Sequence, residues 1–192
     1  MKEGYFVWGM KLVPDACVLD ELIEVENKWN LVKGVSRVSD FPQKAAFCMN
    51  PDFPNNTIMT DSLRNIRRLI VGSARLAQFL QARGLEAVEY LPVAVVNHKK
   101  KVVSRDYFII HPVNPVDCLD IAKSGARFSK IDKTTADEVK KLVLDEKRIP
   151  STRELFRPKP FYDVVLASRE LAEAIVAQGF TGIRWTELDN YS

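Results

Sequence analysis

Residues 69–80 read LIVGSARLAQFL, and residues 164–175 read VVLASRELAEAI. Each stretch begins with a short apolar run and continues with a serine, Ser73 or Ser168, whose hydroxyl can accept a hydrogen bond from an early helical N–H group. Apolar residues then recur at helical spacing in both stretches. Each stretch therefore predicts a short strand followed by a serine-capped helix.

Both predicted helices are followed by a glycine and then by a second apolar run. Gly84 and Gly179 can adopt the left-handed conformation that ends a helix, and the runs at 87–96 and 182–185 predict strands. An offset of 95 residues superposes the two segments with their serines, glycines and second strands in register. We interpret the pattern as one strand–helix–strand unit that occurs twice, because such a unit buries one helix face on a sheet.

The rest of the chain predicts mainly strands and loops. Residues Lys101–His111 follow a polar turn and should pair with 87–96 as a long antiparallel hairpin. Thr135 and Glu138 fit a capping box, which favours a short helix there. Such a helix would run into residues 141–144, which could equally form a strand, so the boundary stays open. Short apolar runs in the first third predict strands at 5–8, 16–19 and 29–32. We therefore expect an α+β fold with a mostly antiparallel sheet and a few packed helices.

Composition places the chain among ordinary globular proteins. Hydrophobic residues make up 46%, charged residues 28%, and the net charge is only +3, which excludes a disordered chain. No linker rich in glycine, serine or proline divides the sequence. We expect one domain over residues 1–192, with an irregular β-rich part at 1–60 and a core at 61–192 that holds both units.

The sequence also indicates a compartment. The N-terminal region has no signal-peptide pattern, and no window approaches the roughly 18 apolar residues of a membrane span. Cys17, Cys48 and Cys118 are widely spaced and contain no CxxC pair, which is typical of reduced thiols. We expect a cytoplasmic protein without a membrane partner.

Charge is distributed unevenly along the chain. The stretch 15–26 contains five acidic residues and no basic one, and such a local field can steer a binding partner. The candidate partner-binding residues of this acidic stretch are Asp15, Asp20, Glu21, Glu24 and Glu26. A rival candidate is the basic patch Arg64, Arg67 and Arg68, which begins a basic segment at 64–105 that also includes Lys99–Lys101. That segment leaves open a nucleic-acid-binding or regulatory module, although few aromatic residues accompany its cations.

One cluster of chemically capable residues is visible near the end of the predicted hairpin. His111, Cys118 and Asp120 contain the groups of a nucleophile site or a metal site. Zinc needs about four ligands at short paired spacings, and the sequence contains no phosphate loop, nucleophile elbow or HExxH motif. We therefore expect structural side chains here, no enzyme activity, no catalytic residue, no cofactor and no metal.

Several segments in a fixed order resemble a family of bacterial immunity-protein domains that was formerly described as a domain of unknown function. The similarity is strongest from residue 61 onward, and Gly34, Pro42, Asp61 and Asn65 fit its looser N-terminal pattern. The segments are LIVGSARLAQFL at 69–80, YFIIHP at 107–112, VDCLD at 116–120 with Ser124, LVLDEKRIPSTRELFR at 142–157 and VLASRELAEAIVAQGFTGIRW at 165–185.

The resemblance implies a function. Such domains occur in polymorphic-toxin and secretion-system loci, where they neutralise a cognate toxin, and the family has no catalytic signature to transfer to this chain. The partner implied is therefore a toxin protein that is bound by protein–protein interaction. The resemblance indicates neither which toxin is bound, nor which surface binds it, nor the oligomeric state.

Overall fold

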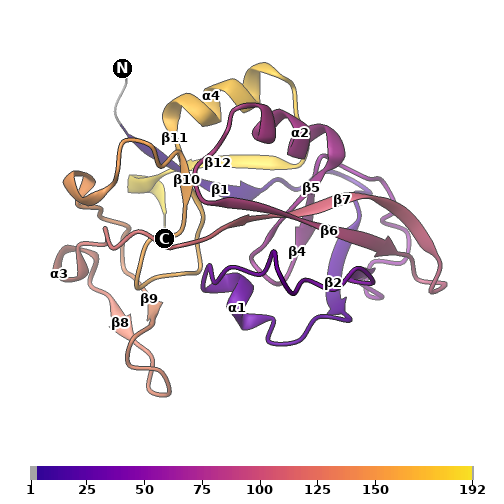
Figure 1. Cartoon of the computed structure of the whole chain (residues 1–192), viewed down its shortest axis with the longest axis horizontal. Helices are drawn as coiled ribbons and strands as arrows, with labels where there is room; N and C mark the ends of the chain where they lie inside the picture. The colour runs from indigo at the N-terminus through magenta and orange to yellow at the C-terminus, as the bar shows by residue number, and fades with distance from the viewer. Residues whose placement is uncertain (1–3, 192) are drawn as a thin grey trace.

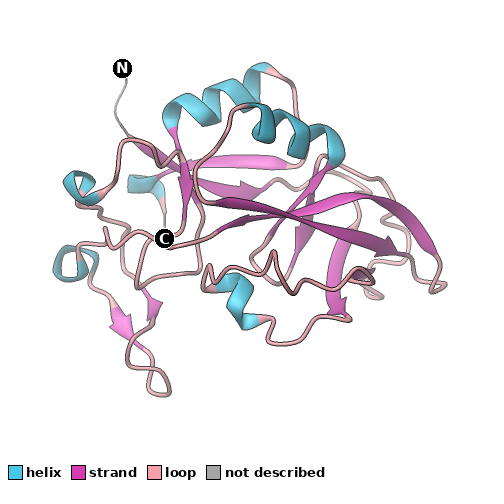
Figure 2. Cartoon of the chain, in the orientation of Figure 1, coloured by secondary structure: helices cyan, strands magenta, loops and turns pink. Residues whose placement is uncertain are grey.

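The structure, a computed structural model, describes residues 4–191. Figure 1 shows two β-structures side by side, with two longer helices on one side of the molecule and a small hairpin projecting at one end. Strands and loops make up most of the chain and the helices are short, as Figure 2 shows. The fold is α+β with a predominance of β-structure, which confirms the predicted class.

A closed barrel forms one of the two β-structures. All of its neighbours are antiparallel except the pairs β2–β4 and β3–β6, which are parallel. Its strands follow the order β2 (Val18–Ile23), β3 (Ala46–Met49), β6 (Val88–Val96), β7 (Val102–Pro112), β5 (Ile70–Ser73) and β4 (Ser62–Asn65). The barrel interior is packed with aliphatic and aromatic side chains, including Leu19, Phe47 and Ile109.

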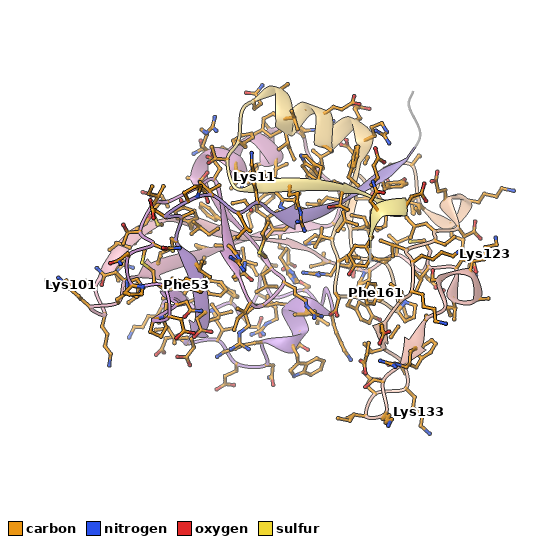
Figure 3. All side chains as sticks on the ribbon, turned by 180° about the vertical axis from the view of Figure 1, so that it is seen from behind. Lys11, Phe53, Lys101, Lys123, Lys133 and Phe161 are labelled. Atoms are coloured by element: carbon orange, nitrogen blue, oxygen red, sulfur yellow. The ribbon has the colours of Figure 1, made fainter. Side chains whose placement is uncertain are left out.

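An antiparallel four-stranded sheet forms the second β-structure. Its strands follow the order β10 (Leu155–Phe156), β11 (Leu166–Ser168), β1 (Tyr5–Met10) and β12 (Ile183–Glu187). A separate hairpin of β8 (Arg127–Phe128) and β9 (Ala136–Glu138) projects from the body, with Lys133 at its tip (Figure 3). The remaining elements are α1 (Trp29–Val32), α2 (Ala74–Ala82), α3 (Ile121–Ser124), α4 (Arg169–Ala177) and the 3₁₀ turns Glu146–Arg148 and Leu188–Asn190.

The two predicted strand–helix–strand units are present as β5–α2–β6 and β11–α4–β12. Ser73 and Ser168 accept the N–H groups of Leu76 and Leu171, and both glycines after the helices have positive φ. In each unit a third strand lies between the two outer ones and runs antiparallel to both: β7 in the first unit and β1 in the second. The two units thus share one arrangement, although their central strands come from different parts of the chain.

Both helices cover a common core. Leu76 and Leu80 of α2 and Leu171 and Ile175 of α4 belong to one apolar cluster together with Trp8 of β1. The aromatic rings of Phe79 and Phe180 add a contact between the units, with centroids 5.4 Å apart. This shared packing holds the barrel against the sheet. None of the helices among residues 4–191 is long and apolar enough to cross a bilayer.

Two local predictions are wrong. The run 29–32, which predicted a strand, forms the helical turn α1, in which Leu31 is the buried residue. The capping box at Thr135 does not start a helix, because its hydroxyl donates to Asp132 Oδ2 (2.9 Å) and the following residues form strand β9. Both segments are four residues or shorter, so tertiary contacts decide their conformation.

Candidate functional site

A pocket opens where the sheet and the barrel diverge. It has a volume of about 730 Å³ and is lined by β1 and β12 on the sheet side and by β4 on the barrel side. Residues 163–165 and the 190–191 segment complete its wall. A pocket of this size is within the range that binds ligands or partner side chains.

Three arginines line this pocket. Arg64 on β4 and Arg184 on β12 are exposed, and within residues 4–191 their guanidinium groups have no ion-pair partner. Arg68, in the β4–β5 turn, forms an ion pair with Asp163, the acidic residue of the pocket lining. Among the described residues the lining therefore holds three guanidinium groups and one carboxylate, an excess of positive charge.

Apolar residues form much of the pocket lining, and one of them, Trp8, has a buried donor without a partner among the described residues. Trp8 is only 7% exposed, and its indole Nε1 has no hydrogen-bond partner in the described part of the chain. Gly9, the next residue of β1, leaves room for Arg184, because a Cβ atom there would lie 3.1 Å from the Arg184 carbonyl oxygen. The aliphatic residues of the lining include Val7, Leu69, Ile70, Val164 and Val165.

The basic patch predicted from sequence is only partly gathered here. Arg64 and Arg68 line the pocket, whereas Arg67 is half-buried outside its lining, and its Nε is without a partner among residues 4–191. Arg184 was not predicted. It sits in the predicted strand 182–185, but only the three-dimensional fold places that strand near β4. The alternation of residues along that strand could have indicated that the Arg184 side chain points outward. No local sequence pattern indicates which other strands lie beside it.

The predicted acidic stretch lies on and around strand β2 of the barrel. Asp20 is half-buried, whereas Asp15, Glu21, Glu24 and Glu26 are exposed. No ion pair holds any of these five carboxylates within residues 4–191. Strand β2 pairs with β4 in parallel, with Val18 opposite Arg64, so the acidic and basic candidate sets occupy neighbouring strands.

His111, Cys118 and Asp120 do not form one site; each has a separate structural environment. His111 is buried on β7, and its Nε2 donates to the Val35 carbonyl oxygen at 2.8 Å; burial lowers its pKa, which favours the neutral ring. Cys118 is fully buried, and burial raises the pKa of its thiol to about 12. Asp120 caps α3 by accepting the N–H group of Lys123 at 3.0 Å.

These environments determine what the three groups can do. A nucleophilic cysteine needs a low pKa and a base within hydrogen-bond reach, whereas burial raises the pKa of the Cys118 thiol. Among the residues that the structure describes, no group of three or more histidine, cysteine or acidic side chains is placed to hold a metal ion. The buried Cys118 thiol therefore stays protonated at neutral pH, and in that form it is a poor nucleophile.

The other cations of the basic segment are dispersed. Arg75 is paired with Asp61, and Arg83 is paired with both Glu154 and Glu170. Lys101 lies at the tip of the β6–β7 hairpin, at one end of the molecule (Figure 3). The segment 64–105 therefore does not form one continuous basic face.

Comparison with known proteins gives one clear result. The model of a family described as "Immunity protein family (Imm11)" matches residues 13–190, which is nearly the whole chain. No curated protein matches the sequence.

Proposed function

The chain belongs to the Imm11 immunity protein family, and from this premise we propose that it neutralises a cognate bacterial toxin by binding it. The observation that carries the proposal is the extent of the family match, which includes both strand–helix–strand units and the pocket strands β4 and β12. A protein of this kind needs a stable scaffold and a charged surface of defined shape. Complementary charge speeds the capture of a partner and rejects wrong partners.

We further propose that neutralisation involves no reaction on this chain. The structure supports this because His111, Cys118 and Asp120 each contribute to folding through a separate contact. We also propose that residues 1–192 form a single domain and that the protein is cytoplasmic. The packing of α2 and α4 on one core supports the single domain, since it joins the barrel to the sheet.

Two surfaces are candidates for the toxin contact. The acidic stretch on and around β2 offers four exposed carboxylates without ion-pair partners in the described residues, which suits a basic toxin. The basic patch offers Arg64 and Arg68 at a pocket, which suits an acidic segment of the toxin. Because the two surfaces have opposite charge, charge reversal distinguishes them.

The alternative function, nucleic-acid binding through the basic segment 64–105, has less support. Binding along a phosphate backbone requires a continuous row of cations, and Arg75 and Arg83 are already neutralised by acidic partners. Salt-sensitive retention of the purified protein on DNA or RNA would favour this alternative.

The function is tested by co-expression with the toxin gene adjacent to this one in its genome. We expect the wild-type protein to restore growth of toxin-expressing cells and to co-purify with the toxin. A toxin that kills equally well in its presence, with no complex formed, would contradict the proposal. The triple variant Asp20→Lys/Glu21→Lys/Glu24→Lys then tests the acidic stretch through toxin affinity and its dependence on salt.

A further inference from the structure

We propose that the pocket between β1, β4 and β12 receives an acidic segment of the toxin that also carries aliphatic side chains. This inference rests on the proposed function and specifies the surface and the chemistry of the contact. It favours the pocket over the acidic stretch, and it replaces the predicted patch Arg64, Arg67 and Arg68 by the set Arg64, Arg68 and Arg184.

The main argument for an acidic ligand is the arrangement of the arginines. Arg64 and Arg184 approach the pocket from two different β-structures, and both guanidinium groups are without an acidic partner within residues 4–191. Arg68 is held by Asp163 and so keeps one orientation at the pocket wall. A guanidinium group offers paired N–H donors that match a carboxylate, so two unpaired arginines can each bind one acidic side chain.

The lining favours a protein segment over a nucleic acid. Nucleic-acid bases need an exposed aromatic face for stacking. The aromatic residues of the lining are Trp8, which is 7% exposed, and Tyr191, which is half-buried with its ring edge-on against Phe161. The pocket instead presents aliphatic side chains, and Leu12 at its edge is 74% exposed. Aliphatic side chains of a partner gain from burial against such a surface.

The experiment measures the affinity of an inactive variant of the adjacent toxin for purified full-length protein. The test variant is Arg64→Glu/Arg184→Glu, which reverses two exposed charges that form no ion pair among the described residues. The control is Lys101→Glu/Arg105→Glu on the exposed β6–β7 hairpin, which changes the net charge equally outside the pocket. Circular dichroism and thermal melting verify that both variants fold.

We expect the test variant to bind the toxin at least about 100-fold more weakly, as the loss of two close charge pairs implies, and the control to bind nearly as the wild type. We also expect poly-L-glutamate to displace the toxin more effectively than a single-stranded DNA oligonucleotide. Unchanged affinity of the test variant, with wild-type binding intact, overturns the pocket and leaves toxin neutralisation standing. Stronger displacement by the DNA oligonucleotide than by poly-L-glutamate also overturns the pocket proposal. If the wild-type protein binds no toxin at all, both the pocket proposal and the proposed toxin neutralisation are wrong.

Discussion

Asp61 and Thr181 are 120 residues apart in the chain, yet Asp61 Oδ2 accepts hydrogen bonds from both the backbone N–H and the hydroxyl of Thr181, each at 2.9 Å. The same carboxylate accepts hydrogen bonds from the Ser73 hydroxyl and from the Arg75 guanidinium. Arg75 in turn lies over the ring of Phe180, 4.1 Å from its centroid. Asp61 therefore fastens the start of the first strand–helix–strand unit to the loop between α4 and β12 of the second.

The first prediction concerns acid stability through Asp61. Burial raises the pKa of this carboxyl, but hydrogen bonds from Arg75, Thr181 and Ser73 outweigh burial and lower it to about 2. Because the folded pKa is lower than the ordinary value of 3.8, the contribution of Asp61 is complete above that value and is lost as the pH falls to about 2. Asp61→Asn should lower the free energy of unfolding by about 2 kcal/mol at pH 7 and by little at pH 2.

The measurement is chemical denaturation of both proteins at several pH values between 2 and 7. Asp52→Asn serves as control, since Asp52 is exposed in a loop and its carboxylate forms no hydrogen bond among the described residues. A stability difference for Asp61→Asn that does not shrink in acid would refute this account of the junction.

The second prediction concerns the glycine beside Thr181. Gly182 has φ of +84°, and a Cβ atom there would collide with the Ser62 carbonyl oxygen and lie 2.8 Å from the Thr60 hydroxyl oxygen. Gly182→Ala should therefore lower the free energy of unfolding by more than about 2 kcal/mol, because strain and collision add. Gly179→Ala is the matched control: φ is +67° but no atom lies within 4 Å, so about 1 kcal/mol is expected from conformation alone. Equal losses of unfolding free energy in the two variants would show that the close approach of Ser62 and Thr60 to Gly182 adds nothing to the cost of a side chain there.

The third prediction compares the two serine caps. Ser73 and Ser168 each accept one N–H group of their helix, and removal of such a cap costs about 1 kcal/mol. Ser73 also donates to Asp61 at 2.9 Å, whereas the second contact of Ser168, to Glu154, is longer at 3.4 Å. We expect Ser73→Ala to be the more destabilising change, and the two losses to add in the double variant because they affect different helices. Thermal and urea unfolding measure both effects, and a larger loss for Ser168→Ala would contradict the predicted order.

Local signals explain how much of this fold the sequence could predict. Ser73, Gly84, Ser168 and Gly179 act on neighbouring backbone groups, so the two helices and their strands are visible without the structure. The closure of the barrel depends on the parallel pairing of β2 with β4, which no local pattern indicates. The central strand β1 of the second unit likewise comes from the opposite end of the chain.

The candidate site was predictable only in part for the same reason. Arg64 and Arg68 belong to a visible basic run, whereas Arg184 and Trp8 join them only through the packing of β12 and β1. Arg157 is an arginine that the sequence alone would place on the surface. It is instead 1% exposed and donates hydrogen bonds to the carbonyl oxygens of Arg68 and Tyr162. Burial lowers its pKa to about 10, so it remains charged at neutral pH inside the protein.

The last prediction concerns the three thiols and tests whether Cys118 could be a nucleophile. Cys17 and Cys118 are fully buried, and burial raises the pKa of their thiols to about 11 and about 12. Burial also raises the pKa of the Cys48 thiol, but this side chain is partly exposed and so remains accessible to a reagent. Because only the thiolate attacks a disulfide reagent, Cys48 alone should react with DTNB in the folded protein at pH 8. All three of the free cysteines should react after unfolding in guanidinium chloride. Cys48→Ser should therefore abolish the reaction of the native protein, and rapid labelling of Cys118 in that variant would restore the case for chemistry at Cys118.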